Sequence, residues 1–221
     1  MRRIVEGLHR FQTAVFPAKR DLFHRLADGQ APRALFITCG DSRIVPDLIT
    51  QTNPGELFIC RNAGNIVPPF GETAGGVSAT IEYAVVALGI ANIIVCGHSD
   101  CGAMKGILHP ETIRSMPTVA SWMQHAEPAR HVVEELYPER TEEEQLELLT
   151  RENVLAQLAN LVTHPSVAAR LARGTLGIFG WHYDISTGEV LTWDAERNRF
   201  VRLEPTERIP SATPRPRHQM D

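Results

Sequence analysis

Short apolar runs alternate along this chain with longer stretches in which apolar residues recur every three or four positions. The short runs, which predict buried strands, lie at residues 34–38, 57–60, 93–96, 176–183 and 190–193. The longer stretches, which predict helices, lie at residues 2–14, 21–27, 46–49, 77–88, 118–137, 141–162 and 165–173, with a break at Pro17. Strand–helix–strand passages in this order predict an α/β fold, with a mostly parallel central β-sheet flanked by α-helices.

The two ends of the chain differ from its middle. The helices before the first strand form an N-terminal arm, residues 1–28, which could pack on the domain or reach over a partner subunit. From residue 205 on, four prolines fall within 17 residues among charged and polar neighbours, which predicts a flexible tail over 205–221. The sequence therefore predicts a single domain, residues 1–204, with this arm and this tail.

Composition narrows the classes of function. A formal net charge of −4 gives no reason to expect nucleic-acid binding, and the longest apolar runs are far too short to span a membrane. The N-terminus has two arginines but lacks the apolar core of a secretory signal. Four cysteines in 221 residues do not predict a disulfide framework, so we expect a reduced compartment.

Three residues that are typical metal ligands follow predicted strands. Cys39 comes after the first strand, and His98 and Cys101 come after the central one. Because the carboxyl ends of parallel strands meet at one edge of a sheet, these side chains are expected to bind one Zn²⁺ and to leave a fourth position for water. The alternative is a buried histidine beside two small buried cysteines. Cys60 and Cys96 lie inside apolar runs and are expected to pack as small hydrophobic residues.

Asp41 and Arg43 stand close to the first of these ligands. Asp41 could take the fourth coordination position itself, which would block water. Paired with Arg43, it could instead turn away from the metal and accept a hydrogen bond from zinc-bound hydroxide. A site with two thiolates is a weak Lewis acid, so it needs such an acceptor and a nearby positive charge. The remaining alternative is a surface salt bridge, which contributes little.

Further motifs in the chain are typical of one family. They are Pro54-Gly55-Glu56-Leu57-Phe58, Arg61-Asn62-Ala63-Gly64-Asn65, Gly75-Gly76, Ile81-Glu82-Tyr83-Ala84, Arg151-Glu152-Asn153-Val154, Leu158-x-x-Leu161, His164-Pro165 and Gly180-Trp181-x-Tyr183-Asp184. Together with Cys39-x-Asp41-x-Arg43 and His98-x-x-Cys101-Gly102, they make the sequence similar to the β-class carbonic anhydrases through about residue 203. Within that family it resembles bacterial members that accompany cyanate degradation or are packaged in cyanobacterial carboxysomes.

The resemblance implies a carbonate dehydratase, which catalyses the zinc-dependent reversible hydration of carbon dioxide to bicarbonate and a proton. Cys39, His98 and Cys101 would hold one zinc ion per chain. Zinc hydroxide would be the nucleophile, and Asp41 and Arg43 would form the catalytic dyad. Two alternatives stay open at this point: a CS₂ or COS hydrolase on the same fold, and a non-catalytic zinc-containing assembly protein.

The resemblance also implies a substrate pocket and an oligomer. The positions that would line the pocket are Gln30, Phe58, Ala63, Tyr83 and Gly102. The Gln30 side chain and the Gly102 backbone N–H would donate hydrogen bonds to substrate oxygen, while the two aromatic rings would keep the pocket narrow. The protein would be a homodimer or a higher oligomer built of dimers, with the N-terminal arm wrapped over a neighbouring subunit.

Two positions depart from the family pattern. Gly40 stands where many relatives carry serine, and it is expected to loosen the loop beside the dyad. Phe36 stands where pH-gated relatives carry a tryptophan of an inhibitory bicarbonate pocket, although Arg61 is retained there. We therefore expect Asp41 to leave the metal open near neutral pH. The resemblance implies a cytoplasmic location, with packaging in a carboxysome as the alternative.

Overall fold

The computed structural model describes residues 1–72, 75–205 and 212 of the chain, and the expected tail over 205–221 therefore lies almost wholly outside the described residues. The chain separates into two units, residues 1–31 and residues 32–221. No helix within the described ranges is both long and apolar enough to cross a membrane. The boundary predicted after residue 28 stays a prediction.

The N-terminal unit is helical. Its elements are α1 (Arg2–Arg10), the π-helical turn η1 (Phe11–Val15), α2 (Phe16–Ala18) and α3 (Arg20–Ala27). The expected break at Pro17 lies two residues later: the chain stays helical through Pro17, which follows the π-helical turn η1, and leaves the helical region at Lys19, with φ −115° and ψ 21°. Apolar side chains of α1, among them Ile4 and Leu8, are more than half exposed in the single chain.

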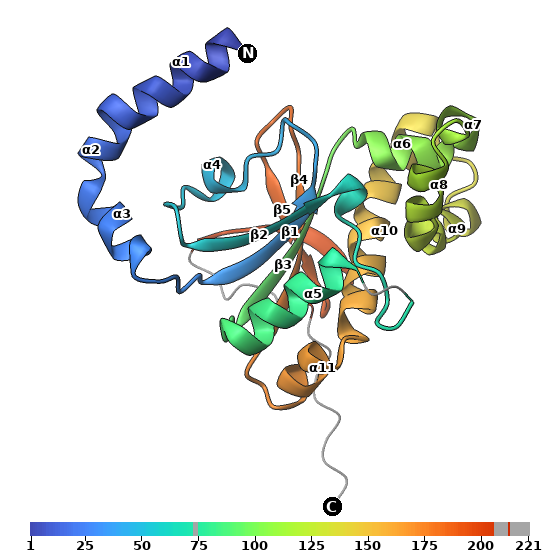
Figure 1. The fold of residues 1–221 in the computed structure, drawn as a ribbon. Coiled ribbons are helices and arrows are strands. Elements are labelled where there is room, and N and C mark those ends of the chain that lie inside the picture. Colours follow the sequence, from blue (N-terminus) through green and yellow to red (C-terminus); the bar gives the residue numbers. More distant parts are fainter. Residues whose placement is uncertain (73–74, 206–211, 213–221) are drawn as a thin grey trace, which may run out of the picture. The chain divides into compact units, whose positions relative to one another are not determined.

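The second unit is built on a mixed, mostly parallel sheet of six strands (Figure 1), which confirms the predicted sheet and adds one strand, β6, to the five that the sequence predicts. Its strands are β1 (Ala34–Cys39), β2 (Leu57–Asn62), β3 (Asn92–His98), β4 (Gly177–Tyr183), β5 (Val190–Asp194) and β6 (Arg199–Arg202). The order across the sheet is β2-β1-β3-β4-β5-β6; the first four strands run parallel, β5 pairs antiparallel with β4, and β6 pairs antiparallel with β5. Because β1 and β3 are neighbours, their carboxyl ends lie side by side.

Helices cover one face of this sheet. They are α5 (Gly76–Glu82), which continues as the π-helical turn η3 (Tyr83–Ala87), α10 (Glu142–Val162) and α11 (Pro165–Ala172). Their apolar side chains form one core cluster with alternate residues of the central strands, such as Leu35, Ile37, Ile93 and Val95. The complete burial of β1 explains why its sequence is a continuous apolar run without alternation.

The remaining helices gather beside the N-terminal half of α10 (Figure 1). They are α6 (Gly102–Leu108), α7 (Pro110–Ile113), α8 (Pro117–Met123), the 3₁₀ turn η4 (Gln124–Ala126) and α9 (Glu127–Leu136), while the short α4 (Pro46–Thr50) follows β1. The single helix expected over 118–137 is wrong. Pro128 lies in the first turn of α9 and supplies no N–H for a continuous helix, so the segment breaks at η4.

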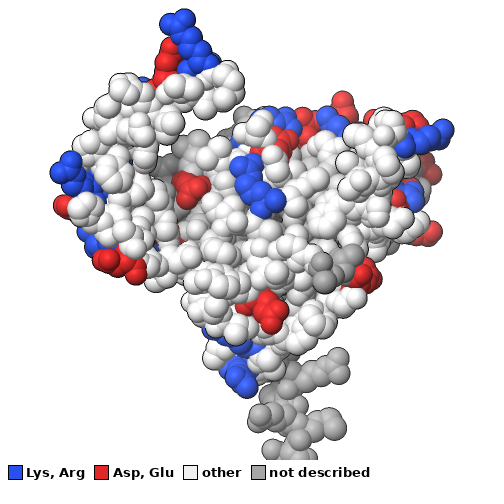
Figure 2. Space-filling model, in the orientation of Figure 1, with Lys and Arg blue, Asp and Glu red and all other residues white. Residues whose placement is uncertain are grey.

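On the face in Figure 2, acidic and basic side chains are interspersed, without a large surface of one sign.

Candidate active site

Cys39, His98 and Cys101 come together at the carboxyl ends of β1 and β3. Cys39 and His98 are the last residues of their strands, and Cys101 is the N-cap residue of α6. The two sulfur atoms lie 4.0 Å apart, and the three potential ligand atoms all lie within 4.8 Å of one another. All three residues are at least nine-tenths buried. The parallel β1–β3 pairing therefore creates the cluster that the sequence predicts.

The donor set of this cluster fits zinc. His98 Nδ1 lies 2.8 Å from the Ser99 carbonyl oxygen, which can only accept, so Nδ1 carries the proton. The other ring nitrogen, Nε2, is buried and has no hydrogen-bond partner within the described residues. A buried lone pair on imidazole beside two thiol sulfurs is the arrangement expected of a Cys₂His zinc site with one open position.

The two thiols have different acidities in the metal-free geometry. A hydrogen bond from Cys101 lowers the pKa of the Cys39 thiol, and the Gly64 backbone N–H, which donates to Cys39 Sγ at 3.4 Å, lowers that pKa further. The contact with Cys39 raises the pKa of the Cys101 thiol, and burial raises it as well. The shared hydrogen bond thus favours a pair with one thiolate and one thiol, and binding of a metal ion releases the remaining proton.

Asp41 and Arg43 form a closed pair beside the cluster. Asp41 Oδ1 accepts hydrogen bonds from the Arg43 backbone N–H at 2.9 Å and from Nε at 3.0 Å, and Oδ2 accepts one from Nη2 at 2.8 Å. The guanidinium side-chain hydrogen bonds hold the pKa of the Asp41 carboxyl well below its usual range. Asp41 Oδ2 also lies 4.0 Å from His98 Nε2. The carboxylate is thus ionised, turned toward Arg43, and adjacent to the free histidine nitrogen.

Asp100 and Arg61 hold this pair in place, and the contact of Asp100 is not predicted from the sequence. Arg43 Nη1 donates to Asp100 Oδ2 at 2.9 Å, and Nη2 donates to the Asp100 backbone oxygen at 3.1 Å. Asp100 also forms an ion pair with Lys105 and adopts a left-handed conformation, φ 55°. Arg61 donates to the backbone oxygens of Cys39 and Asp41, at 3.1 and 2.6 Å. The backbone that carries both Cys39 and Asp41 is therefore held in place.

Comparison with known proteins agrees with this geometry. The carbonic anhydrase family profile matches residues 34–190. The chain is 52% identical, over 203 residues that cover 92% of both sequences, to a carbonic anhydrase of Pseudomonas aeruginosa. The chain belongs to the β-carbonic anhydrase family. Its structure superposes on that of the β-carbonic anhydrase CcaA with a TM-score of 0.92, at 48% identity, covering 95% of this chain and 94% of CcaA. A tetrameric β-carbonic anhydrase of Sordaria macrospora superposes with a TM-score of 0.78, at 30% identity, covering 86% and 95%.

The structure of this β-carbonic anhydrase also places the residues predicted to line the substrate pocket. Phe58 on β2 and Tyr83 on η3 face each other, with ring centroids 6.0 Å apart. Ala63 begins a 3₁₀ turn beside Gly64, and Gly102 is the first residue of α6. Gln30 belongs to the N-terminal unit. The structure thus brings the two aromatic rings together, whereas the substrate contacts of all the pocket residues stay predictions.

The structure shows what surrounds Gly40 and Phe36, the two residues that depart from the family pattern. A Cβ built on Gly40 would meet only the Asn62 backbone, at 3.8 Å, so the position has room for a side chain. The Gly40 N–H donates to the Asn62 carbonyl oxygen at 2.8 Å, which supports the loop. Phe36 is fully buried and packs edge-on against Trp181, with centroids 6.0 Å apart. Whether this loop is looser than in relatives, and whether Phe36 changes gating, stay predictions.

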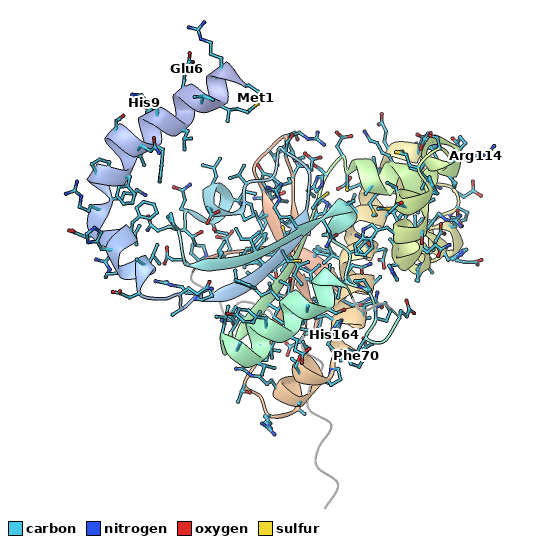
Figure 3. All side chains as sticks on the ribbon, in the orientation of Figure 1. Met1, Glu6, His9, Phe70, Arg114 and His164 are labelled. Carbon is cyan, nitrogen blue, oxygen red and sulfur yellow. The ribbon has the colours of Figure 1, made fainter. Side chains whose placement is uncertain are left out.

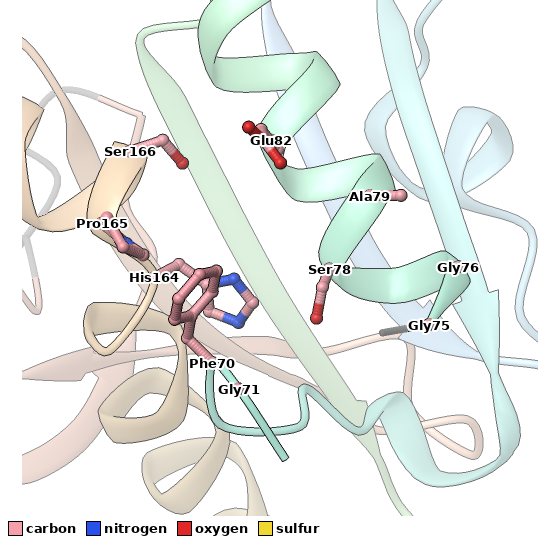
Figure 4. Close-up of a pocket in the computed structure, with 10 residues that line it drawn as sticks. All are labelled: Phe70, Gly71, Gly75, Gly76, Ser78, Ala79, Glu82, His164, Pro165 and Ser166. Carbon is pink, nitrogen blue, oxygen red and sulfur yellow. The ribbon is translucent and has the colours of Figure 1, made fainter. Parts of the chain in front are cut away.

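Two cavities lie near α5. One of about 780 Å³ is lined by residues of α5 and α11 and by Phe70 and His164, and its lining includes no residue of the metal cluster or the dyad (Figure 4). Phe70 and His164 lie next to each other, with ring centroids 5.8 Å apart (Figure 3). The other, of about 390 Å³, is lined in part by Arg61 and Trp122, and Trp122 Nε1 donates to the Ala63 carbonyl oxygen. The smaller cavity therefore adjoins residues that contact the site.

Proposed function

We propose that this chain catalyses the reversible hydration of carbon dioxide to bicarbonate, with one Zn²⁺ held by Cys39, His98 and Cys101. The observation that carries the proposal is the convergence of two thiol sulfurs and an unpartnered imidazole nitrogen beside an ionised Asp41, in a chain of the β-carbonic anhydrase family. A zinc ion bound there supplies Lewis acidity, which can lower the pKa of a water molecule to about 7.

The dyad orients the attacking water. Asp41 Oδ2 lies 4.0 Å from His98 Nε2 and can accept a hydrogen bond from a water molecule in the position that the three ligands leave open. Since Arg43 keeps the pKa of Asp41 low, this carboxylate stays an acceptor and cannot store the released proton near neutral pH. A C–O bond forms between the water oxygen and the carbon of CO₂, one proton is lost to solvent, and bicarbonate results. Asp41 thus orients the attacking water, and the hydrogen bonds from Arg43 hold the carboxylate in place for this role.

The predicted substrate contacts complete the proposal. The Gly102 N–H lies at the start of α6, directly after a proposed ligand, where it can donate to an oxygen of CO₂. Phe58 and Tyr83 would limit the width of the pocket, beside Ala63. Gln30 would donate a second hydrogen bond. The cavity lined by Arg61 supports an approach for a small neutral substrate from that side.

We also propose an oligomer built of dimers. Apolar side chains of α1 are exposed in the single chain, and β2 forms an edge of the sheet within the described residues. Both features leave surface that a second copy can cover. Tetramers in the Sordaria macrospora relatives are consistent with this proposal. A cytoplasmic or carboxysomal location stays a prediction from the resemblance.

The test is stopped-flow CO₂ hydration as a function of pH, on protein whose zinc content has been measured. We expect one zinc per chain and rapid hydration that rises with pH around neutrality and then saturates. Full zinc with activity that recovers only in alkali would show that Asp41 closes the site near neutral pH. Full zinc without CO₂ hydration at any pH would overturn the proposed reaction.

A further inference from the structure

The loop between β2 and α5 has a strained conformation next to the metal cluster. Gly64 has φ 79° and ψ 18°, and Asn65 has φ 48°, so two consecutive residues are left-handed. A Cβ on Gly64 would lie 3.2 Å from side-chain atoms of α6, which explains the glycine. Left-handed residues persist only where neighbouring groups fix them. This loop therefore needs external hydrogen bonds to keep its shape.

Those hydrogen bonds come from a row of amides on α10. Asn153 Nδ2 donates to the Gly64 carbonyl oxygen at 2.9 Å, and Asn160 Nδ2 donates to the Val67 carbonyl oxygen at 3.0 Å. Between them, Gln157 Oε1 accepts from the Val67 N–H at 2.8 Å, and its Nε2 donates to Asn153 Oδ1 at 2.9 Å. Asn153 and Gln157 are fully buried. Burial of two amides is costly unless each is hydrogen-bonded, and here both are.

The same loop contacts a proposed metal ligand. The Gly64 N–H donates to Cys39 Sγ at 3.4 Å, while the Gly64 carbonyl oxygen accepts from Asn153. Asn153 therefore acts on the residue that contacts the sulfur. Asn160 makes an equivalent bond three residues farther along the loop, where no bond to Cys39 is made.

We propose that Asn153, held in place by Gln157, is a positioning residue for the zinc ligand Cys39, because it fixes the Gly64 N–H against the thiolate. The proposal rests on the zinc site proposed above. Groups that hydrogen-bond to metal ligands fix their orientation, and loss of one typically lowers metal affinity about 10- to 100-fold. A purely structural role of the α10 amides would instead affect Asn153 and Asn160 alike.

The test compares Asn153→Leu with Asn160→Leu, in the full-length chain. Each change replaces an amide by an uncharged side chain of similar size and leaves one loop carbonyl without its amide donor. Zinc affinity is measured by competition with a chelator, and the thiolate-to-metal charge-transfer band is measured on Co²⁺-substituted protein. For Asn153→Leu we expect affinity to fall about tenfold or more and the band to shift. For Asn160→Leu we expect affinity within about twofold of the unmodified protein and an unchanged band.

A second variant covers the case in which Asn153→Leu does not fold. Asn153→Asp keeps an acceptor for Gln157 and removes the amide donor to Gly64, although it also places a carboxyl group at a fully buried position. In the folded protein that binds one zinc, this variant should also shift the cobalt band. Equal effects of the changes at 153 and 160 on affinity and spectrum, in a chain that binds one zinc, would overturn this inference alone. An unmodified chain that binds no zinc would overturn the proposed metal site and this inference together.

Discussion

Replacing the Asp41 carboxylate by an amide tests the proposed dyad most directly. Asp41 accepts three hydrogen bonds from Arg43, two at Oδ1 and one at Oδ2. In Asp41→Asn, one oxygen becomes an NH₂ group. If the oxygen stays toward the backbone N–H, the NH₂ group faces Arg43 Nη2, which lies 2.8 Å from Oδ2 in this structure, and two donors then oppose each other.

The structure sets the size of the expected effect. A hydrogen bond to a charged group contributes about 1.5–3 kcal/mol, and the loss of one such contact corresponds to about 10- to 150-fold in rate if it is needed in the transition state. Asp41 also supplies Oδ2, which lies 4.0 Å from His98 Nε2 and is proposed to accept a hydrogen bond from the attacking water. We therefore expect kcat to fall by roughly 100-fold, within the range that the loss of one such hydrogen bond gives. Zinc content should stay at one per chain, because Asp41 is turned toward Arg43.

The assay is stopped-flow CO₂ hydration with metal content measured on the same sample. Asp47→Asn is the matched control, since Asp47 lies on the neighbouring helix α4 and makes no hydrogen bond or ion pair with Arg43 within the described residues. Turnover of Asp41→Asn within about threefold of the unmodified protein would remove Asp41 from the mechanism. Loss of zinc from this variant would show instead that Asp41 is a ligand.

Three other predictions test the ligand set, the packing and the acid stability. Cys101→Ser should lose most of its zinc, and full occupancy by metal analysis would contradict the ligand assignment. Gly180→Ala should lower the free energy of unfolding by about 1–3 kcal/mol in urea titrations, because a Cβ there would lie 2.8 Å from Leu158 and 2.9 Å from Val154; an unchanged midpoint would refute this close packing. Hydrogen bonds from a serine hydroxyl and backbone N–H groups of its turn lower the pKa of Asp184 to about 2, so its stabilising contribution is present above about pH 4 and is lost as the pH falls toward 2. Asp184→Asn should therefore be less stable than the unmodified protein at pH 5 and equally stable near pH 2, whereas a constant difference would refute the linkage.

The sequence predicts the sheet and the metal cluster because both depend on strong local signals. The buried strands β1 and β3 are continuous apolar runs, and the ligands stand at their ends. The strand β6 was not predicted, since only Phe200 and Val201 are apolar in it. This strand forms because it pairs antiparallel with β5, and the pattern of apolar residues within β6 does not reveal that pairing.

The contacts around the site were harder to predict for a similar reason. Asp100 meets Arg43 across 57 positions of sequence, and the contact depends on a left-handed turn after β3. Asn153 of α10 meets Gly64 across 89 positions, although the motif that contains Asn153 is recognised in the sequence. A motif identifies residue types at a fixed spacing, whereas such contacts depend on how distant segments meet in the fold.

The distance along the chain between the ligands has a consequence for protein synthesis. Cys39 and Cys101 are 62 positions apart and meet only after β1 and β3 have paired in parallel. A nascent chain therefore exposes Cys39 long before its two co-ligands have been translated. Parallel pairing across a long intervening segment is slow, because the entropy of closing the loop is lost before the contacts form. Metal loading must wait for the central strands to assemble, so any partner that captures the early thiol would compete with maturation of the enzyme.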